Sequence, residues 1–425
     1  MAFLDAAALL LVLAAAFGFV NHHVLKLPFA IGLMVSGLLA SGGVLVLDAL
    51  VPAWGAAEMV RRVVIGIDFS ETVLSGMLSL LLFAGALHTD LSQLKERIAT
   101  ISALASVGVV ISTAVAGGIA FLGFRAFGVE IGWIWCLAFG ALISPTDPIA
   151  VLGIMKAAKA PKQLEVKVIG ESLFNDGTGV VLFTILVGAG VATMSAAPGA
   201  AEEALGTGKI VSLLVKEIVG GVALGLALGW VCYRGFRTLD EPNLEILMSV
   251  ATVFAIGVVA SRAHVSAPLA AVAAGLLIGN RGRLHAMSER TAQSLDVVWM
   301  FIDEMLNAVL FLLIGFEVFA IDYSRKSYWM VLSCLIPGVL LARFVGVALP
   351  IAILRLRREI DPGTVRVLTW GGLKGGISVA LAMKLPEFEG RNAVLTVTYG
   401  IVIFSIIVQG LTVGRLIRRV YPQPS

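Results

Sequence analysis

Residues 144–148 of the chain read Ser-Pro-Thr-Asp-Pro, and they interrupt an apolar run that extends from 131 to 154. A second interruption, Gly-Gly-Leu-Lys-Gly-Gly at 371–376, lies inside the apolar run 364–384. Proline removes a backbone donor from a helix and glycine lowers helix propensity, so both runs are predicted to be helices that unwind in the middle. Unwound backbone at membrane depth is tolerated only where protein surrounds it or where it lines a water-filled cavity. The two interruptions therefore predict a polar site at the centre of a membrane protein.

The composition agrees with a membrane environment. Of the 425 residues, 59% are hydrophobic and 14% are charged, and the mean hydropathy is +0.97. Soluble domains carry about 25% charged residues, so a cytosolic enzyme, a secreted disulfide scaffold and a disordered chain are excluded. The net charge of +3 is too small to indicate a nucleic-acid partner. Cys136, Cys232 and Cys334 lie far apart with no spacing for zinc or redox chemistry, and we expect no cofactor.

The apolar runs predict an all-α polytopic membrane protein. A helix that crosses the hydrocarbon core needs about 20 mostly apolar residues. Thirteen segments meet this requirement, at 5–22, 28–47, 70–88, 98–124, 131–154, 164–192, 209–236, 244–262, 266–280, 293–320, 327–354, 364–384 and 392–414. The loops between them leave no room for a second domain.

The thirteen predicted spans divide into six, one and six, and the fifth span of each half is an interrupted one. A single linker helix between equal halves places the second half upside down relative to the first, which is the inverted repeat of secondary transporters. The predicted units are a first six-helix repeat at 1–192, a linker helix at 193–240 and a second six-helix repeat at 241–425. The linker helix carries Gly221, Gly225 and Gly229 in a ladder that predicts close packing against a neighbouring helix.

The distribution of Lys and Arg predicts the orientation. Loops on one side of the predicted spans hold nineteen of these residues, and loops on the other side hold nine. Cytoplasmic loops carry the excess of positive charge. We therefore expect the C-terminus in the cytoplasm and, with an odd number of spans, the N-terminus outside.

Ionisable residues inside the predicted spans are candidates for function. Each costs about 2.5–3.5 kcal/mol at a helix centre. They are Asp147, Glu171, Asp176, Lys216, Glu217, Asp303, Glu304, Glu317, Arg343 and Lys374. The sixth span is the richest, because four-residue spacing places Glu171 over Asn175 and Ser172 over Asp176 on adjacent stripes of one helix. The second of these stripes offers a hydroxyl and a carboxylate, which suit a small cation.

The charges also predict which residues pair. Arg343 is the deep arginine of the second half and needs a partner; Glu171 is the candidate, because that pairing leaves Asp176 free to titrate. Asp176 and Asp147 are then the working pair of carboxylates. Where the interrupted helices break, Asp147 can balance the partial positive charge of a half-helix N-terminus and Lys374 the partial negative charge of a C-terminus.

Several motifs carry a resemblance to a known family. Gly-Glu-Ser-Leu-Phe-Asn-Asp-Gly-Thr-Gly-Val-Val at 170–181, after Ser-Pro-Thr-Asp-Pro, resembles the monovalent cation:proton antiporters, and among them the NhaP-like branch that includes the eukaryotic sodium/proton exchangers. The likeness extends to Leu-His-Thr-Asp-Leu at 87–91, Ala-Gly-Leu-Leu-Ile-Gly-Asn at 274–280, Gly-Gly-Leu-Lys-Gly at 371–375 and Val-Gln-Gly-Leu-Thr at 408–412.

This resemblance implies a homodimer in a prokaryotic cytoplasmic membrane that exchanges sodium, and also lithium, for protons by alternating access. It implies cation and proton binding by Asp176, Asp147, Ser172 and Thr146, with Asn175, Glu171, Arg343 and Lys374 as the supporting network. The Asn-Asp pair at 175–176, where other antiporters carry Asp-Asp, is similar to the electroneutral branch. The partners expected are a second copy of the chain, membrane lipids and monovalent cations.

Two departures from the family pattern keep alternatives open. Lys374 stands where family members usually have arginine, and Ala84 stands where many NhaP-like members have an acidic residue. Potassium/proton exchange on the same fold therefore stays open. A cation channel would need a continuous pore, which an inverted repeat with crossed breaks does not favour. An intramembrane aspartyl protease with Asp147 and Asp176 as its dyad would leave the repeat unexplained, so we expect a transporter and not an enzyme.

Overall fold

The computed structural model of the chain describes residues 3–51, 55, 58, 60, 69–147, 149–194, 207–320, 325–356, 360–361 and 363–422, and their regular structure is helical throughout. Ten of the described helices are long and apolar enough to cross a membrane. The expectation of an all-α polytopic membrane protein is thereby confirmed.

The first half of the chain forms helices over most of its predicted spans. Short π-helical turns continue several of them, as at Asn21–Leu25, Thr72–Met77 and Leu104–Gly108. The elements are α1 (Phe3–Val20), α2 (Phe29–Leu50), α4 (Phe69–Glu71), α5 (Leu78–Leu87), α6 (Leu91–Glu96), α7 (Ile98–Ala103), α8 (Val109–Ala126), α9 (Trp133–Ile143), α10 (Ile149–Ala157) and α11 (Lys162–Met194).

The second half follows the helix α13 (Thr207–Phe236). Its elements are α14 (Pro242–Ala263), α15 (Ala267–Leu276) with a π-helical turn at Leu277–Gly282, α16 (Arg283–His285), α17 (Glu289–Phe316), α18 (Lys326–Arg355), α19 (Gly363–Trp370), α20 (Gly376–Met383), α21 (Arg391–Phe404) with a π-helical turn at Ser405–Gln409, and α22 (Gly410–Val420).

Both interrupted helices are present where the sequence predicts them. One break separates α9 from α10, and the other separates α19 from α20. These halves are too short to count among the ten long spans, and the predicted ninth span, 266–280, is not among them either. The total of thirteen spans, the division into inverted repeats and the orientation of the termini stay predictions.

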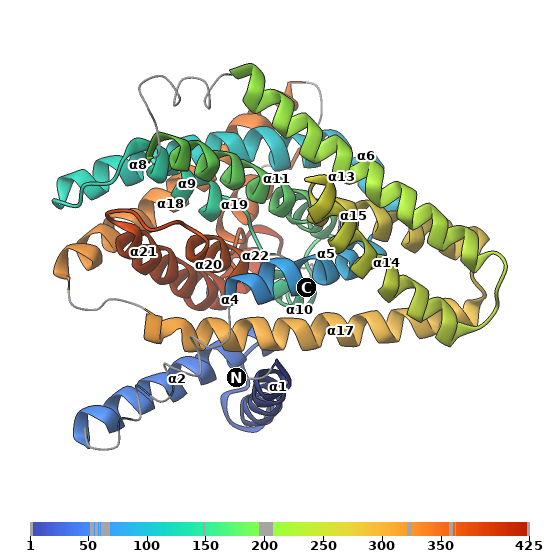
Figure 1. The fold of residues 1–425 in the computed structure, drawn as a ribbon, viewed down its shortest axis with the longest axis horizontal. Helices are drawn as coiled ribbons and strands as arrows, with labels where there is room; N and C mark the ends of the chain where they lie inside the picture. The colour runs from blue at the N-terminus through green and yellow to red at the C-terminus, as the bar shows by residue number, and fades with distance from the viewer. Residues whose placement is uncertain are drawn as a thin grey trace.

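The long helix α17 lies between the N-terminal helices and the rest of the molecule (Figure 1). It packs closely on α2, where a Cβ atom at Gly37 would lie 3.1 Å from Gly315 Cα. Ser41 Oγ donates to the Gly315 carbonyl at 3.1 Å beside this contact. The absence of side chains at Gly37 and Gly315 therefore lets the two helices meet at their backbones.

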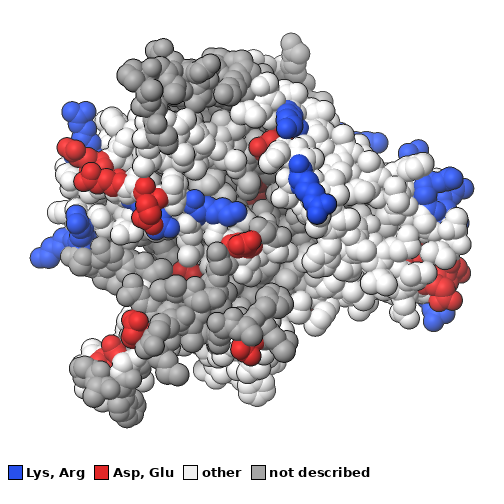
Figure 2. Space-filling view, in the orientation of Figure 1, with Lys and Arg blue, Asp and Glu red and all other residues white. Residues whose placement is uncertain are grey.

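The surface has broad areas without charge. Large parts of the face in Figure 2 are free of Lys, Arg, Asp and Glu. Large apolar side chains such as Leu247 and Phe254 on α14 and Phe301 on α17 are more than 60% exposed. An apolar exterior of this kind suits contact with lipid, where helices satisfy their own backbone groups.

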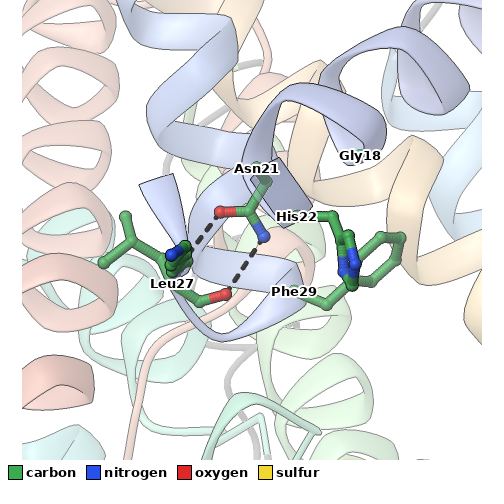
Figure 3. Close-up of a pocket in the computed structure, with 6 residues that line it drawn as sticks. Gly18, Asn21, His22, Leu27 and Phe29 are labelled. Carbon is green, nitrogen blue, oxygen red and sulfur yellow. Dashed lines mark hydrogen bonds between the residues drawn. The ribbon is translucent and has the colours of Figure 1, made fainter. Parts of the chain in front are cut away.

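The turn between α1 and α2 is held by one side chain. Asn21 Nδ2 donates to the Leu27 carbonyl at 3.0 Å, and Leu27 N donates to Asn21 Oδ1 at 3.2 Å (Figure 3). Lys26 has φ 53°, which reverses the chain between the two helices. A cavity of about 400 Å³ opens beside this turn, with His22 and Phe29 among its lining residues. The amide of Asn21 thus closes the first helical hairpin.

The glycine ladder of α13 packs on α15, as the sequence predicts. A Cβ atom at Gly221 would lie 2.6 Å from Ser266 O, and one at Gly229 would lie 3.0 Å from Ala274 Cα. A Cβ atom at Gly225 would overlap the carbonyl oxygen of Ala270. Small residues at such an interface let helix backbones approach closely, which is how helices associate in lipid.

This contact predicts that Gly225→Ala destabilises the protein, because the added methyl group must displace backbone. We expect a loss of about 1–3 kcal/mol, the usual cost of overpacking. Thermal unfolding of the detergent-solubilised protein, followed by tryptophan fluorescence, measures it. Gly257→Ala on α14 is the matched control, since nothing lies within 4 Å of a Cβ atom there. Equal melting temperatures for the two variants would contradict the packing described.

Candidate ion-binding site

The two unwound stretches lie against each other and exchange backbone contacts. Asp147 N donates to the Leu373 carbonyl at 2.8 Å. Lys374 Nζ donates to the carbonyls of Ser144 at 3.0 Å and Pro145 at 3.2 Å, just beyond the last residue of α9. The Lys374 side chain therefore sits at the C-terminal end of a half-helix, as the sequence predicts, and that half-helix belongs to the other broken span.

Asp147 occupies the opposite end of this arrangement. Its carboxylate packs against Gly375, where a Cβ atom would lie 3.0 Å from Asp147 Cγ. Gly375 is the residue before α20, so the carboxylate lies at a half-helix N-terminus. Partial positive charge at that end favours an anion. Asp147 is partly exposed, whereas Lys374 is buried.

The helix α11 supplies the polar side chains that face the first break. Asn175 Nδ2 donates to Thr146 Oγ1 at 2.9 Å, and Thr146 N donates to Asn175 Oδ1 at 3.4 Å. Thr146 Oγ1 and Ser172 Oγ are 3.1 Å apart. A Cβ atom at Gly179 would overlap the ring of Pro145, so glycine there lets the unwound stretch lie close to α11. Asn175 thereby holds Thr146, whose hydroxyl in turn contacts that of Ser172.

Asp176 is the buried carboxylate of the site. Its residue surface is 5% exposed, and it interacts electrostatically with Asp147 and with Lys374. No hydrogen bond to its carboxylate is found within the described residues. Burial of a carboxylate charge is costly, and the Asp147 charge adds repulsion, so a proton or a cation bound at Asp176 would offset this cost.

Glu171 and Arg343 form a buried ion pair with two parallel hydrogen bonds. Arg343 Nη2 donates to Glu171 Oε2 at 2.9 Å, and Arg343 Nη1 donates to Glu171 Oε1. Arg343 Nε and Nη2 also donate to the Leu368 carbonyl, at 3.2 and 3.1 Å. The guanidinium packs against Gly372, where a side chain would collide with it. The pair that the sequence predicts is present, and it braces α11, α18 and α19.

The eight candidate residues thus converge on the two breaks. The division into four ion ligands and a supporting network of four stays a prediction. Two further polar side chains hold the second break. Ser405 Oγ accepts from Lys374 N at 2.9 Å, and Gln409 Nε2 donates to the Trp370 carbonyl at 2.9 Å. Sequence reasoning missed both roles. Gln409 lies in the motif at 408–412, which marked it without showing what it contacts.

Two other motifs of the sequence meet outside the site. Asn280 Oδ1 accepts from Leu91 N at 2.8 Å, and Asn280 Nδ2 donates to the Thr89 carbonyl at 2.9 Å. Asp90 caps α6, and hydrogen bonds from the Ser92 side chain, the Gln93 side chain and the backbone lower the pKa of its carboxyl to about 2. These motifs therefore fix the junction between α5, α6 and the end of α15.

The chemistry available at the breaks is that of hard oxygen ligands. Carboxylates, hydroxyls and backbone carbonyls bind alkali and other hard cations, whereas thiolate and imidazole ligands select transition metals. The described residues contain no cluster of three or more His, Cys, Asp or Glu that would hold a resident metal ion. The carboxylates, hydroxyls and carbonyls at the two breaks are ligands of this hard oxygen kind.

Comparisons with known proteins agree with this chemistry. Residues 8–419 match the family described as "Sodium/hydrogen exchanger, transmembrane". The chain is 43% identical to the Na(+)/H(+) antiporter NhaP of Pseudomonas aeruginosa over 98% of its own length and 97% of that protein. It is 34% identical to the Na(+)/H(+) antiporter NhaH of Halobacillus dabanensis over 83% of both chains.

A solved structure shares the fold. The sodium proton antiporter MjNhaP1 from Methanocaldococcus jannaschii, determined at pH 8, superposes with a TM-score of 0.74. The alignment covers 100% of both chains at 17% sequence identity. This likeness establishes the helical architecture.

The buried ion pair predicts that Glu171→Gln and Arg343→Met each lower the free energy of unfolding by about 3–5 kcal/mol, because each leaves one buried charge unpaired. Thermal unfolding in detergent measures this loss. The double variant Glu171→Met/Arg343→Met should melt above either single variant, since it removes both charges together.

The matched control is Glu387→Gln, which removes an exposed carboxylate whose Oε1 lies 3.2 Å from Arg391 Nη1. Exposed pairs contribute at most about 1 kcal/mol, so this variant should melt like the wild type. If Glu171→Gln also melted like the wild type, the bracing role of the pair would be wrong.

Proposed function

Because this chain belongs to the sodium/hydrogen exchanger family, we propose that it exchanges sodium, and also lithium, for protons across the membrane by alternating access. The observation that carries the proposal is the buried Asp176 carboxylate beside Asp147 at the meeting point of two broken helices. Broken helices at matching positions form the binding sites of secondary transporters.

The cation ligands in this proposal are Asp176, Asp147, Ser172 and Thr146. Thr146 and Ser172 are 3% and 2% exposed, and their hydroxyls lie 3.1 Å apart. Thr146 precedes Asp147 in the chain, and Ser172 lies one helical turn before Asp176. When a monovalent cation binds there, protein oxygen atoms replace water molecules of its hydration shell. Asn175 has both ends of its amide engaged by Thr146, so it positions ligands.

Exchange follows from competition at Asp176. The buried carboxylate needs one positive partner, and a proton and a cation exclude each other there. The cation binds when the site is open to one side of the membrane and leaves when the site is open to the other side. The proton makes the opposite journey in the same cycle. Because one proton replaces one monovalent cation, the exchange is electroneutral. No covalent step is involved.

The proposal also includes the setting of the protein. We place it in a prokaryotic cytoplasmic membrane as a homodimer, with the N-terminus outside and the C-terminus in the cytoplasm. The excess of Lys and Arg on one set of loops supports this orientation.

Potassium/proton exchange is the alternative that two departures from the family pattern leave open. Lys374 contacts backbone carbonyls through a single ammonium group, where an arginine would present a planar fork. Ala84 is buried in an apolar cluster of α5 that includes Phe83 and Leu87, so this position offers no carboxylate to a cation. Ion selectivity therefore belongs in the first experiment.

We expect Asp176→Asn to abolish exchange, because asparagine cannot alternate between a proton and a cation. The measurement is internal pH in proteoliposomes after a sodium gradient is imposed, with the membrane voltage clamped by potassium and valinomycin. Lithium is tested in the same way, and potassium under a different clamp. Glu130→Gln is the matched control, since it changes an exposed carboxylate in the same manner and should leave exchange intact. Sodium-driven proton movement by Asp176→Asn would overturn the assignment.

Competition also predicts a pH dependence. Protons displace the cation from Asp176, so the apparent KM for sodium should rise as the pH falls, by at most about tenfold per unit of pH for one proton against one cation. The maximal rate at saturating sodium should change less than KM. The measurement is the initial rate against sodium concentration at several pH values, equal on both sides of the vesicle. A KM that does not depend on pH would indicate separate sites for the two ions.

A further inference from the structure

A small cavity lies at the second break, between α18, α19 and α21. Its volume is about 10 Å³, which is close to the space that one water molecule needs. Apolar side chains of α18 and α21, among them Val339 and Ile401, form one part of its lining. The polar part of the lining consists of Arg343, Thr369, Lys374 and Gln409. A buried water needs two to four polar partners, so this lining is sufficient to bind one.

Thr369 is the residue of this lining whose hydroxyl lacks a partner. Its Oγ1 atom is buried and makes no hydrogen bond within the part of the chain that the structure describes. The hydroxyls of Thr178 and Thr252, which also lie in helices, donate to the carbonyl one turn earlier, at 3.0 and 2.8 Å. Thr369, near the end of α19, does not make this bond. A buried hydroxyl without a partner costs free energy, so a ligand in the cavity that bonds it would stabilise the structure.

The two cationic side chains of the lining have further hydrogen-bond donors to offer. The guanidinium of Arg343 has five N–H groups and makes four hydrogen bonds, to Glu171 and to the Leu368 carbonyl. The ammonium of Lys374 has three N–H groups and makes two hydrogen bonds to backbone carbonyls. The like charges of Arg343 and Lys374 also interact unfavourably. A water oxygen in the cavity would accept from these cations and offset part of that repulsion.

We propose that this cavity binds one water molecule, which accepts from the Lys374 ammonium and bonds the Thr369 hydroxyl. Thr369 is then a positioning residue, because it acts on Lys374 through the water and touches neither of the exchanged ions. The Lys374 ammonium interacts electrostatically with the Asp176 carboxylate, and opposite charges attract. An ammonium that loses the water is less restrained, so it moves closer to Asp176 and competes with a cation there. This role in exchange rests on the proposed function, whereas the water site does not.

Thermal unfolding of Thr369→Val in detergent tests the water site, because valine keeps the shape of threonine and removes the hydroxyl. If the hydroxyl bonds a water, the melting temperature should fall by about 2–4 °C. If the hydroxyl has no partner, its removal should leave the melting temperature unchanged or raise it, and that result would overturn the proposal. Thr398→Val is the matched control, since Thr398 Oγ1 is also buried without a partner among the described residues and Thr398 does not line this cavity. An equal fall in both variants would likewise contradict the water site.

The sodium dependence of exchange in proteoliposomes tests the positioning role. Thr369→Val should raise the apparent KM for sodium about threefold, the scale of one lost hydrogen bond, with the maximal rate at saturating sodium little changed. Thr369→Ser keeps the hydroxyl and should have a KM close to that of the wild type. An unchanged KM in Thr369→Val, or a serine variant no closer to the wild type than the valine variant, overturns the positioning role.

The two measurements separate this inference from the proposed function. Absence of exchange in the wild type overturns the proposed function, while the melting temperatures still decide the water site. If Thr369→Val does not fold, Thr369→Ser and Thr369→Ala are compared, because these two variants differ by the hydroxyl alone. The serine variant should then melt at the higher temperature, and a serine variant that melts no higher than the alanine variant contradicts the water site.

Discussion

The constraint on which the structure depends is the need of unwound backbone for partners inside an apolar medium. The two broken helices meet this need by contacting each other. Asp147 N and the Leu373 carbonyl form one hydrogen bond between them, and Lys374 supplies two more to the carbonyls of Ser144 and Pro145. Each break therefore supplies hydrogen-bond partners to the other. Polar groups concentrate at this point because the backbone N–H and C=O groups freed by unwinding need hydrogen-bond partners inside an apolar medium.

The surrounding helices keep the breaks in register. Asn175 on α11 binds Thr146, and Ser405 binds the backbone of Lys374, so each unwound stretch is attached to an intact helix of its own half of the chain. Glu171 and Arg343 connect the two halves at the same level. The carboxylate of Asp176 is left as the group that these braces do not use. The hydrogen bonds and the ion pair thus hold the helices around Asp176 without using its carboxylate.

Much of this arrangement is predictable, because it depends on residue types that few other structural settings would explain. Two prolines and a run of glycines mark the breaks, and a deep arginine requires a deep carboxylate, which leads to Glu171. The glycine ladder of α13 predicts its packing on α15. By contrast, the contacts of Arg343 with the Leu368 carbonyl and of Lys374 with the Ser144 carbonyl involve backbone groups that every residue has, so no pattern reveals them. The π-helical turns at Thr72–Met77 and Leu104–Gly108 are equally hidden, since they depend on how neighbouring helices fit.

The amide of Asn175 has a consequence for how such a site can change. It offers Thr146 a donor and an acceptor at once. An aspartate, which has the same size, could do so only with its carboxyl group protonated. An ionised aspartate at this position only accepts, so the Thr146 hydroxyl would have to turn toward it and away from Ser172. The number of charges beside Asp176 and the orientation of its hydroxyl neighbours would then change in a single step. A substitution at position 175 therefore changes the charge of this site and the geometry of its hydroxyl groups together.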